Sequence, residues 1–586
     1  MARTRIRRTL SEQNLLLLLS LLVGVLSGLA AVLLLRVVGL LQGVLMPLAQ
    51  STSDFHFLWL FLLPGAGMLI SLLIVRFLVK DNISHGVTRV LQSMSRNESR
   101  IKPHNIWSSI ATSAVTIGFG GSVGAEAPIV YSGAAIGSNI GRSFGLSYRN
   151  ITILLGCGAA GAIAGIFKAP LAGVLFTLEI LLFNISMSSM MPLLISTVSA
   201  SVVSCMLQGS DPVFLCEIAP FNFGNIPFYV ILGVLGGFGS LYFLRTTLFL
   251  EDKLSKFKNV WGKWAFCAAG LGVMMIVLPP LFGEGYDTVI DLLHGEASGA
   301  MSTSSIGSLL SWKWGIPLFF ALIFFMKVFS MTLTNAGGGV GGTFGPTLVV
   351  GAIAGFVLAR VVNNLGTCVS LPEPNFVLVG MAALMAGVMQ APMTAIFLIA
   401  EITGGYSLFI PLIIASTVSY GVTRIWERYS IYTKRLAQKG ELLTHDNDQS
   451  ALALMSTADL IRDKYPKVGL NMTLREILET VASSTAQVLA VVDEDNKFQG
   501  LIDVGSIRPL MFKTEEYDSL RVFNLMEQPP AYIFLDEKPD AVMHKFDKTG
   551  AWRLPVVTRD YTYLGFISNS RLLMAYRQEL RQLTDD

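Results

Sequence analysis

The chain has 586 residues, of which 52% are hydrophobic and only 14% are charged, whereas an average soluble domain has about 25% charged residues. It also contains 55 glycines. This composition excludes a disordered chain and a collagen-like chain, and a single soluble protein does not cover so much apolar surface.

Charge divides the chain into two parts. Residues 436–586 hold 17 Lys+Arg and 23 Asp+Glu, whereas residues 1–435 hold 26 and 17. The first part therefore predicts a membrane-embedded body, and the second predicts a water-soluble domain. We place a linker over residues 436–450 and two similar soluble subdomains over 451–518 and 519–586.

The membrane part opens with MARTRIRR, and an uncharged run over 13–35 follows. This run is long enough to cross the hydrocarbon core of a bilayer, and the arginines in front of it predict a cytoplasmic N-terminus. Further uncharged runs follow, so we expect more than ten helical segments in an all-α polytopic protein. These runs cover residues 180–210, 328–359, 374–400 and 402–423.

Two glycine-rich stretches interrupt these runs. Residues 118–128 read GFGGSVGAEAP, and residues 337–355 contain eight glycines and Pro346. A plain spanning helix does not need such stretches, and lipid tolerates non-helical backbone only inside protein or beside a water-filled cavity. The sequence therefore predicts broken helices that line a polar pathway.

The membrane part also repeats itself. The segment GAEAPIVYSGAAIG (124–137) matches GTFGPTLVVGAIAG (342–355), and APLAGVLFTLEI (169–180) matches APMTAIFLIAEI (391–402). The two matches occur in the same order at nearly the same offset, which predicts duplicated halves over about 14–215 and 222–433. Inverted repeats with broken helices at the bilayer midplane are typical of transporters.

Each glycine-rich motif predicts a loop followed by a helix start. The amino end of a helix offers free N–H groups and a partial positive charge, so two such ends facing each other bind an anion without a basic side chain. Glu126 lies at one of these starts, and its ionised carboxylate is able to occupy an anion position itself. We therefore predict that Glu126 acts as a gate, as a proton carrier, or as both. The alternative is a glutamate that only caps or packs against a helix.

At these motifs the chain resembles the CLC family of chloride channels and proton-coupled chloride transporters. GAEAP (124–128) is similar to the family's gating-glutamate motif, GTFGP (342–346) to its G-x-F-x-P motif, and SIYTKRLAQKG (430–440) to its last pore helix. The resemblance implies a homodimer with one anion pathway in each subunit. It also implies anion contacts from the backbone of five residues and from the Tyr432 hydroxyl; the five are Gly124, Ala125, Ala127, Thr343 and Phe344.

Three positions depart from the family pattern. His85 stands where the family has a serine that donates to the anion, so the transported anion is chloride, nitrate or another anion. A one-residue shift of the motif would make Ser84 the donor instead. The alternative is a histidine that packs beside the pathway without contacting the anion. Ala125 replaces a basic residue beside the gate. Ile180 stands where many proton-coupled members carry a second glutamate, and its neighbour Glu179 is expected to be structural.

The soluble tail contains a second repeat. Residues 488–511 resemble residues 553–576, and each copy predicts strand, turn, strand and the start of a helix. This resembles a pair of CBS domains with an α/β fold, which in many cases bind adenine nucleotides. The nucleotide pattern is degenerate here, with Ser568, Arg571 and Asp503 as the candidate contacts. A structural or dimerising role is the alternative.

Taken together, we expect a chloride pathway gated by Glu126. Ile180 favours a passive channel, and a chloride/proton antiporter is the alternative. Chloride is the expected bound ion, and no cofactor, metal site, nucleic-acid partner or enzymatic activity is expected. An intramembrane protease that uses Ser132 and a nucleotide sensor with a membrane anchor are the competing classes. Short loops favour a bacterial inner membrane with the N-terminus and the tail in the cytoplasm.

Overall fold

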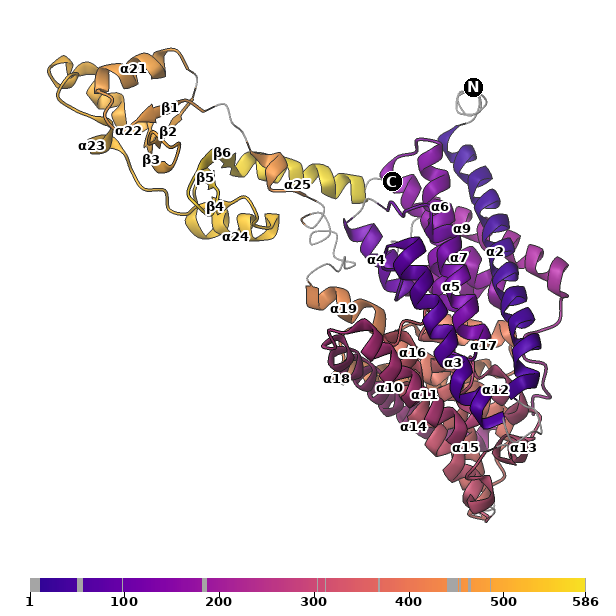
Figure 1. The fold of residues 1–586 in the computed structure, drawn as a ribbon. Helices are drawn as coiled ribbons and strands as arrows, with labels where there is room; N and C mark the ends of the chain where they lie inside the picture. Colours follow the sequence, from indigo (N-terminus) through magenta and orange to yellow (C-terminus); the bar gives the residue numbers. More distant parts are fainter. Residues whose placement is uncertain are drawn as a thin grey trace. The chain divides into compact units, whose positions relative to one another are not determined.

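The computed structural model shows two compact units, Met1–Leu442 and Leu443–Asp586, which are helical and mixed α/β respectively (Figure 1). Each is described by itself. The structure describes residues 11–49, 56–96, 99–181, 187–302, 304–310, 312–366, 369–439, 452, 455–461, 465–484 and 486–584. The basic N-terminal octapeptide and residues 440–450 of the expected linker lie outside these ranges. Residues 436–439 are the end of a helix rather than part of a linker.

The membrane unit is built from helices, as expected. Those of its first half are α2 (Glu12–Ala49), α3 (His56–Leu73), α4 (Gly86–Arg96), α5 (Asn105–Gly118), α6 (Glu126–Ser143), α7 (Tyr148–Phe167), α8 (Pro170–Ile180) and α9 (Met187–Gln208). Those of its second half are α10 (Ile226–Ser255), α11 (Val260–Val277), α12 (Tyr286–Leu293), α13 (Ala297–Ser302), α14 (Gly315–Ala336), α15 (Phe344–Asn364), α16 (Glu373–Met389), α17 (Pro392–Ile402), α18 (Phe409–Trp426) and α19 (Ile431–Lys439).

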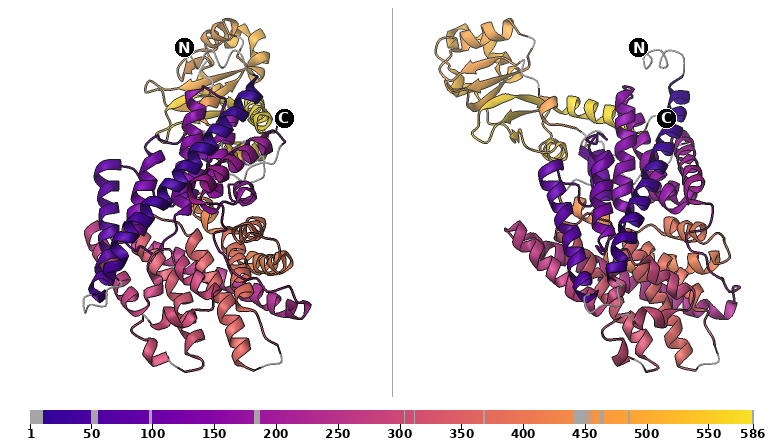
Figure 2. Two further views of the ribbon diagram at one scale, coloured as in Figure 1. Left: turned by 90° about the vertical axis from the view of Figure 1, so that its right-hand side faces the viewer. Right: turned by 45° about the vertical axis from the view of Figure 1, so that its right-hand side comes forward.

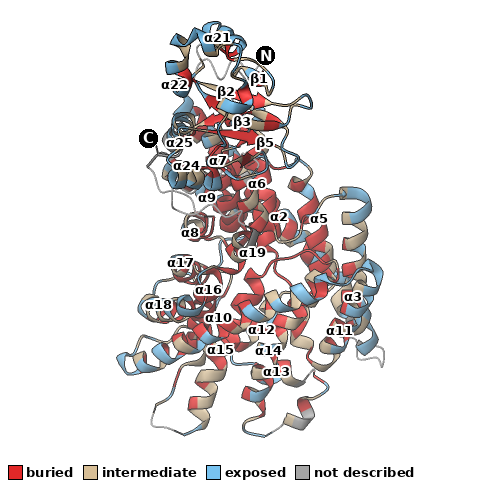
Figure 3. Cartoon of the chain, turned by 90° about the vertical axis from the view of Figure 1, so that its left-hand side faces the viewer, coloured by how far each residue is buried: buried red, intermediate tan, exposed pale blue. Residues whose placement is uncertain are grey.

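Among the described residues, nine helices are long and apolar enough to cross a membrane. Shorter apolar helices such as α8 and α17 lie among them, with prolines at their first turns. Buried residues fill the centre of this unit, and exposed apolar residues lie on its outer helices (Figure 3). This distribution fits a body surrounded by lipid rather than by water.

Glycine contacts show that the two halves pack in the same way. A Cβ at Gly133 of α6 would lie 2.2 Å from the carbonyl oxygen of Gly158 on α7, and a Cβ at Gly351 of α15 would lie 2.4 Å from that of Gly380 on α16. The small residues let the two backbones of each pair come close, as is common between membrane helices. The equivalent positions in the repeat therefore make equivalent contacts.

The soluble unit contains two three-stranded sheets of identical topology, visible from two sides in Figure 2. In each sheet the first strand is parallel to the second, and the second is antiparallel to the third. The strands are β1 (Lys467–Gly469), β2 (Val488–Val492), β3 (Phe498–Asp503), β4 (Ile533–Phe534), β5 (Arg553–Val557) and β6 (Tyr563–Ser568). The helices are α21 (Leu474–Ala482), α22 (Val504–Ile507), α23 (Val522–Leu525), α24 (Pro539–Thr549) and α25 (Asn569–Thr584).

Aromatic residues join the two halves of the soluble unit. Phe498 of the first half stacks on Tyr563 of the second at 5.6 Å between ring centroids, and it contacts Phe566 edge-on at 6.3 Å. The Tyr563 N–H also donates to the carbonyl oxygen of Asn496 at 2.9 Å. The two copies of the repeat therefore share one apolar junction, as the two members of a domain pair do.

Candidate functional site

The two glycine-rich loops meet in the centre of the membrane unit. The Gly124 N–H donates to the carbonyl oxygen of Gly342 at 3.0 Å, and the Gly342 N–H donates to that of Gly124 at 2.7 Å. A Cβ at Gly124 would lie 2.1 Å from Oε2 of Glu126, so only glycine fits there. Helices α6 and α15 start directly after these loops, and the predicted broken helices are thereby confirmed.

Glu126 is buried, with 1% of its surface exposed. Its Oε2 accepts a hydrogen bond from the Gly345 N–H at the first turn of α15, at 3.2 Å, and its Oε1 accepts one from the Tyr286 hydroxyl at 2.5 Å. The carboxylate therefore lies on the amino end of a helix from the other half of the repeat. It occupies a place where free N–H groups favour an anion.

A second carboxylate lies at the amino end of α6. Oε1 of Glu284, in the loop before α12, accepts a hydrogen bond from the Ala125 N–H at 2.8 Å. The fully buried Lys327 of α14 holds this loop, because its Nζ donates to the carbonyl oxygens of Gly283 at 3.0 Å and Leu281 at 3.4 Å.

Sequence reasoning missed Glu284, Tyr286 and Lys327. Lys327 carried a signal, since it is the one charged residue in the 22-residue helix α14, and an ionisable residue within an apolar membrane helix is a functional candidate by default. Glu284 and Tyr286 belong to neither repeated motif, so nothing in the sequence connects them with Glu126.

The residues expected around the central anion come together. The Thr343 hydroxyl donates to the Tyr432 hydroxyl at 3.5 Å, and the Thr88 hydroxyl donates to the Tyr432 carbonyl oxygen at 3.4 Å. Phe344 is buried, with the ring of Phe167 at 5.8 Å between centroids. The starts of α4 and α15 thus both contact Tyr432 at the start of α19.

His85 directly precedes α4 and has a left-handed backbone with φ 58°. Its Nε2 lies 4.0 Å from Oε1 of Glu251, and Arg435 binds the same carboxylate through two nitrogens. The Ser84 hydroxyl donates to Oδ1 of Asn82 at 2.6 Å. The structure therefore places the His85 side chain beside an ion pair, and it places the Ser84 hydroxyl on a local turn.

Ile180 is buried, and Glu179 beside it points to another helix. Oε1 of Glu179 accepts the Met393 N–H at 3.0 Å, and Oε2 accepts the Thr394 N–H at 2.7 Å, both at the amino end of α17. These contacts fit the structural role expected for Glu179.

The remaining candidates form hydrogen bonds with other groups of the protein, and Arg571 donates to the Asp459 carbonyl oxygen at 3.1 Å. The Ser132 hydroxyl is buried and donates to the Asn105 carbonyl oxygen at 3.1 Å. Asp503 accepts the Gly505 N–H at 2.9 Å, and the Ser568 hydroxyl accepts the Arg571 N–H at 3.3 Å. Both soluble-domain residues therefore bind the first turns of helices, and their contact with a nucleotide stays a prediction.

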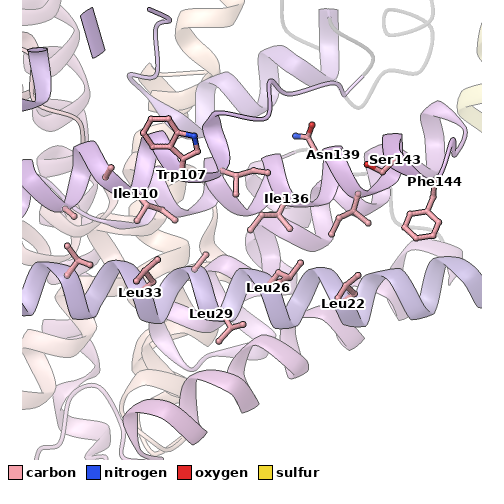
Figure 4. Close-up of a pocket in the computed structure, with 16 residues that line it drawn as sticks. Leu22, Leu26, Leu29, Leu33, Trp107, Ile110, Ile136, Asn139, Ser143 and Phe144 are labelled. Atoms are coloured by element: carbon pink, nitrogen blue, oxygen red, sulfur yellow. The ribbon is translucent and has the colours of Figure 1, made fainter. Parts of the chain in front are cut away.

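An apolar groove of about 830 Å³ lies between α2, α5 and α6, with leucines of α2 facing Ile110, Trp107 and Ile136 (Figure 4). Its lining contains the polar side chains of Asn139 and Ser143 and is otherwise apolar. Its lining includes none of the residues around Glu126, so it has no part in the anion site.

The comparisons with known proteins decide the family. The model of the voltage gated chloride channel family matches residues 66–424. The chain belongs to this family, known as CLC. A CBS domain model matches residues 458–512, so the soluble unit of this CLC protein is of CBS type.

Two curated relatives and one solved structure show how far the likeness extends. The H(+)/Cl(-) exchange transporter ClcA of Vibrio cholerae is 28% identical over 437 residues, which cover 72% of this chain and 88% of that protein. The chloride channel protein CLC-e of Arabidopsis thaliana is 27% identical over 561 residues, which cover 85% of this chain and 76% of that protein. The crystal structure of a slow cyanobacterial Cl-/H+ antiporter has a TM-score of 0.64 at 22% identity, covering 74% of this chain and 99% of that one.

These findings confirm a multi-pass CLC membrane protein that transports anions, with an α/β CBS-type tail. The family is one of transport proteins rather than enzymes. Among these relatives, ClcA is named an exchange transporter and CLC-e is named a channel.

Proposed function

We propose that the protein is a chloride/proton antiporter in which Glu126 is both the gate and the proton carrier. The observation that carries this proposal is the hydrogen bond from the Gly345 N–H to Oε2 of Glu126. A carboxylate in that position competes with chloride for the amino end of α15, because Gly345 directly follows Thr343 and Phe344, the residues proposed to hold the central anion. The likeness to ClcA of Vibrio cholerae, which is named an H(+)/Cl(-) exchange transporter, supports exchange rather than passive flow.

The exchange follows from the charge of Glu126. The ionised carboxylate stays on the amino end of α15 and blocks the pathway. A protonated carboxyl group is a weak acceptor, so it leaves this position and chloride takes its place beside the N–H groups. Chloride enters only while the proton is bound, and the proton is released when Glu126 returns. Exchange in opposite directions further requires that Glu126 takes up the proton on one side of the membrane and releases it on the other.

The same proposal assigns the anion contacts. The outer position uses the backbone of Gly124, Ala125 and Ala127, and the central position uses the backbone of Thr343 and Phe344 with the Tyr432 hydroxyl. Chloride is the expected ion, with His85 as the residue that tunes the choice among anions. No lysine side chain is needed to hold the ion, which favours rapid release.

Ile180 requires a different inner proton route. Its side chain carries no proton, and Glu179 is bound to α17. We infer that protons reach Glu126 from the inner solution through water in the inner part of the anion pathway. This is how an exchanger works without an acid at position 180.

We also propose that two copies form a homodimer, each with its own pathway. Exposed apolar residues of α9 and α18, among them Val198, Val202 and Ile413, are available for such a contact. We propose a bacterial inner membrane as its location, with the N-terminus and the CBS pair in the cytoplasm. Adenine nucleotide is the candidate ligand of the CBS pair.

Proton movement in liposomes under a chloride gradient tests the proposal. The purified protein is reconstituted, and the voltage is clamped with a potassium ionophore. Proton transport against its gradient, driven by chloride, is the expected result. Chloride flux without any proton movement would show a passive channel instead.

A further inference from the structure

The amino ends of both broken helices are occupied by carboxylates, and the two carboxylates come from different elements. Glu126 of α6 occupies the end of α15, through the Gly345 N–H. Glu284, 159 residues away in sequence from Ala125, occupies the end of α6. The Ala125 N–H is one of the donors assigned above to the outer anion position. Glu284 therefore accepts a hydrogen bond that chloride at this position would otherwise accept.

The loop that carries Glu284 is fixed from two sides. The Gly283 N–H donates to the carbonyl oxygen of Gly120 at 3.0 Å, which ties the loop to the segment before α6. Lys327 donates to the Gly283 carbonyl oxygen from α14. Gly285 has φ 96°, a conformation that favours glycine and turns the chain into α12. The Glu284 carboxylate is therefore directed at Ala125 by a rigid support.

The charged and titratable groups around Glu284 belong to three helices, α6, α12 and α14. Glu126 of α6 and the exposed Asp287 of α12 repel its negative charge, whereas the Lys327 ammonium of α14 attracts it. The hydroxyl of Tyr286, the first residue of α12, donates a hydrogen bond to Glu126. Glu126 and Glu284 thus lie in one pathway with the buried Lys327 ammonium. The arrival of an anion or a proton at one carboxylate therefore changes the electrostatic interaction with the other.

We propose that Glu284 is a second gate, a carboxylate that competes with chloride at the outer end of α6 as Glu126 does at α15. Chloride reaches the outer position only when Glu284 leaves the Ala125 N–H, or becomes protonated and weakens that bond. Lys327 keeps the displaced carboxylate near the site. This inference rests on the proposed anion pathway and not on proton coupling.

Anion flux alone tests the second gate. In liposomes that hold the full chain, we would measure chloride uptake at external pH from 4.5 to 8.5 with Glu126→Ala, which lacks the first gate. Flux of Glu126→Ala is expected to rise as the external pH falls, because Glu284 remains. The Glu126→Ala/Glu284→Gln double variant is expected to lose this dependence and to half-saturate at about tenfold lower external chloride, which corresponds to about 1.4 kcal/mol.

The matched control is Asp287→Asn, which removes an exposed charge next to the loop without touching Ala125. In the Glu126→Ala background it is expected to keep the pH dependence. Glu284→Asp, whose shorter side chain retains the charge, is expected to fall between the parent and Glu284→Gln, and it replaces the latter if that variant is not recovered as a monodisperse protein.

A pH-independent flux in Glu126→Ala, or the same pH profile with and without Glu284→Gln, would overturn the second gate and leave Glu284 as a helix cap. Both results are independent of proton coupling. A wild-type protein that moves chloride but no protons would overturn the proposed antiport, while this test of Glu284 still gives its answer.

Discussion

Glu179 and Glu401 each cap the helix that carries the other. Glu179, near the end of α8, accepts the Met393 and Thr394 N–H groups of α17, and Glu401, near the end of α17, accepts the Leu171 and Ala172 N–H groups of α8 at 3.0 and 2.9 Å. Each carboxylate satisfies two N–H groups that have no partner within their own helix. The pair therefore locks two short helices of opposite halves together.

We expect Glu179→Ala and Glu401→Ala to lower the thermal unfolding temperature of the membrane unit by similar amounts. Each change leaves two N–H groups without their acceptor and costs about 1–2 kcal/mol. Thermal denaturation in detergent measures the shift. A large loss for one variant and none for the other would contradict the symmetric arrangement.

The coupling ratio separates this structural role from a role in proton transfer. Glu179→Gln keeps an acceptor oxygen for α17 but does not carry a proton, so the ratio of protons to chloride is expected to stay at its wild-type value. Loss of proton movement in Glu179→Gln with chloride flux intact would make Glu179 the inner proton carrier instead.

Glu126→Ala is expected to remove pH gating by Glu126 and proton coupling, and to leave chloride flux. The change removes the carboxylate from the Gly345 N–H and so opens the end of α15 to chloride. Simultaneous recordings of chloride and proton flux measure this. Uphill proton transport in Glu126→Ala would exclude Glu126 as the carrier.

Tyr286→Phe is expected to shift the pH at which chloride flux is activated upward by about one to two units. The Tyr286 hydroxyl donates to Oε1 of Glu126 and stabilises the ionised, blocking carboxylate, and loss of a hydrogen bond to a charged group costs about 1.5–3 kcal/mol. Protonation therefore opens the pathway at a higher pH. Chloride flux measured against pH gives the shift. The same substitution in Glu126→Ala serves as the control and should cause no such shift.

His85→Ser is expected to change the preference among chloride, nitrate and bromide, which flux measurements under each anion gradient would detect. The change restores the hydroxyl of the family motif and removes a side chain that lies 4.0 Å from Glu251. Ser84→Ala is the control for the alternative register, and it should leave the order of anions unchanged. An unchanged order in His85→Ser would place this residue outside the anion path.

Phe498→Ala is expected to destabilise both halves of the soluble unit together. Phe498 is buried and contacts Tyr563 and Phe566 of the other half, and truncation of a buried phenylalanine costs about 3–5 kcal/mol. Limited proteolysis of the full chain should therefore cut both halves at a similar rate. Cleavage confined to the first half would show that the junction contributes little.

The repeat made the centre of the site predictable. The alignment that paired Gly124 with Gly342 and Glu179 with Glu401 found positions that contact each other or exchange contacts in the structure. This works because an inverted repeat places equivalent residues around one internal axis. Short motifs also predicted the first residues of α6 and α15 correctly, because a glycine loop and a proline in the first turn define where each of these helices begins.

The surroundings of Glu126 were not predictable in the same way. Glu284, in the loop before α12, and Tyr286, at the start of α12, belong to neither repeated motif. They reach Ala125 and Glu126 through contacts between segments far apart in the sequence. The orientation of His85 likewise depends on Glu251 of α10, which carries no motif. Contacts between unrelated segments have no local signal in a single sequence.

The two glycine-rich loops, which are hydrogen-bonded to each other, limit the motions available to the membrane unit during transport. Gly124 and Gly342 exchange two hydrogen bonds across the internal axis, and a Cβ at Gly342 would lie 2.9 Å from Cβ of Ala127. A rocking motion of one half against the other, which many repeat-built transporters use, would break both bonds at the centre of the pathway. We therefore expect turnover to depend on rotations of single side chains within a scaffold whose two halves stay in place. Its rate should respond far more to substitutions at these side chains than to the thickness or stiffness of the surrounding bilayer.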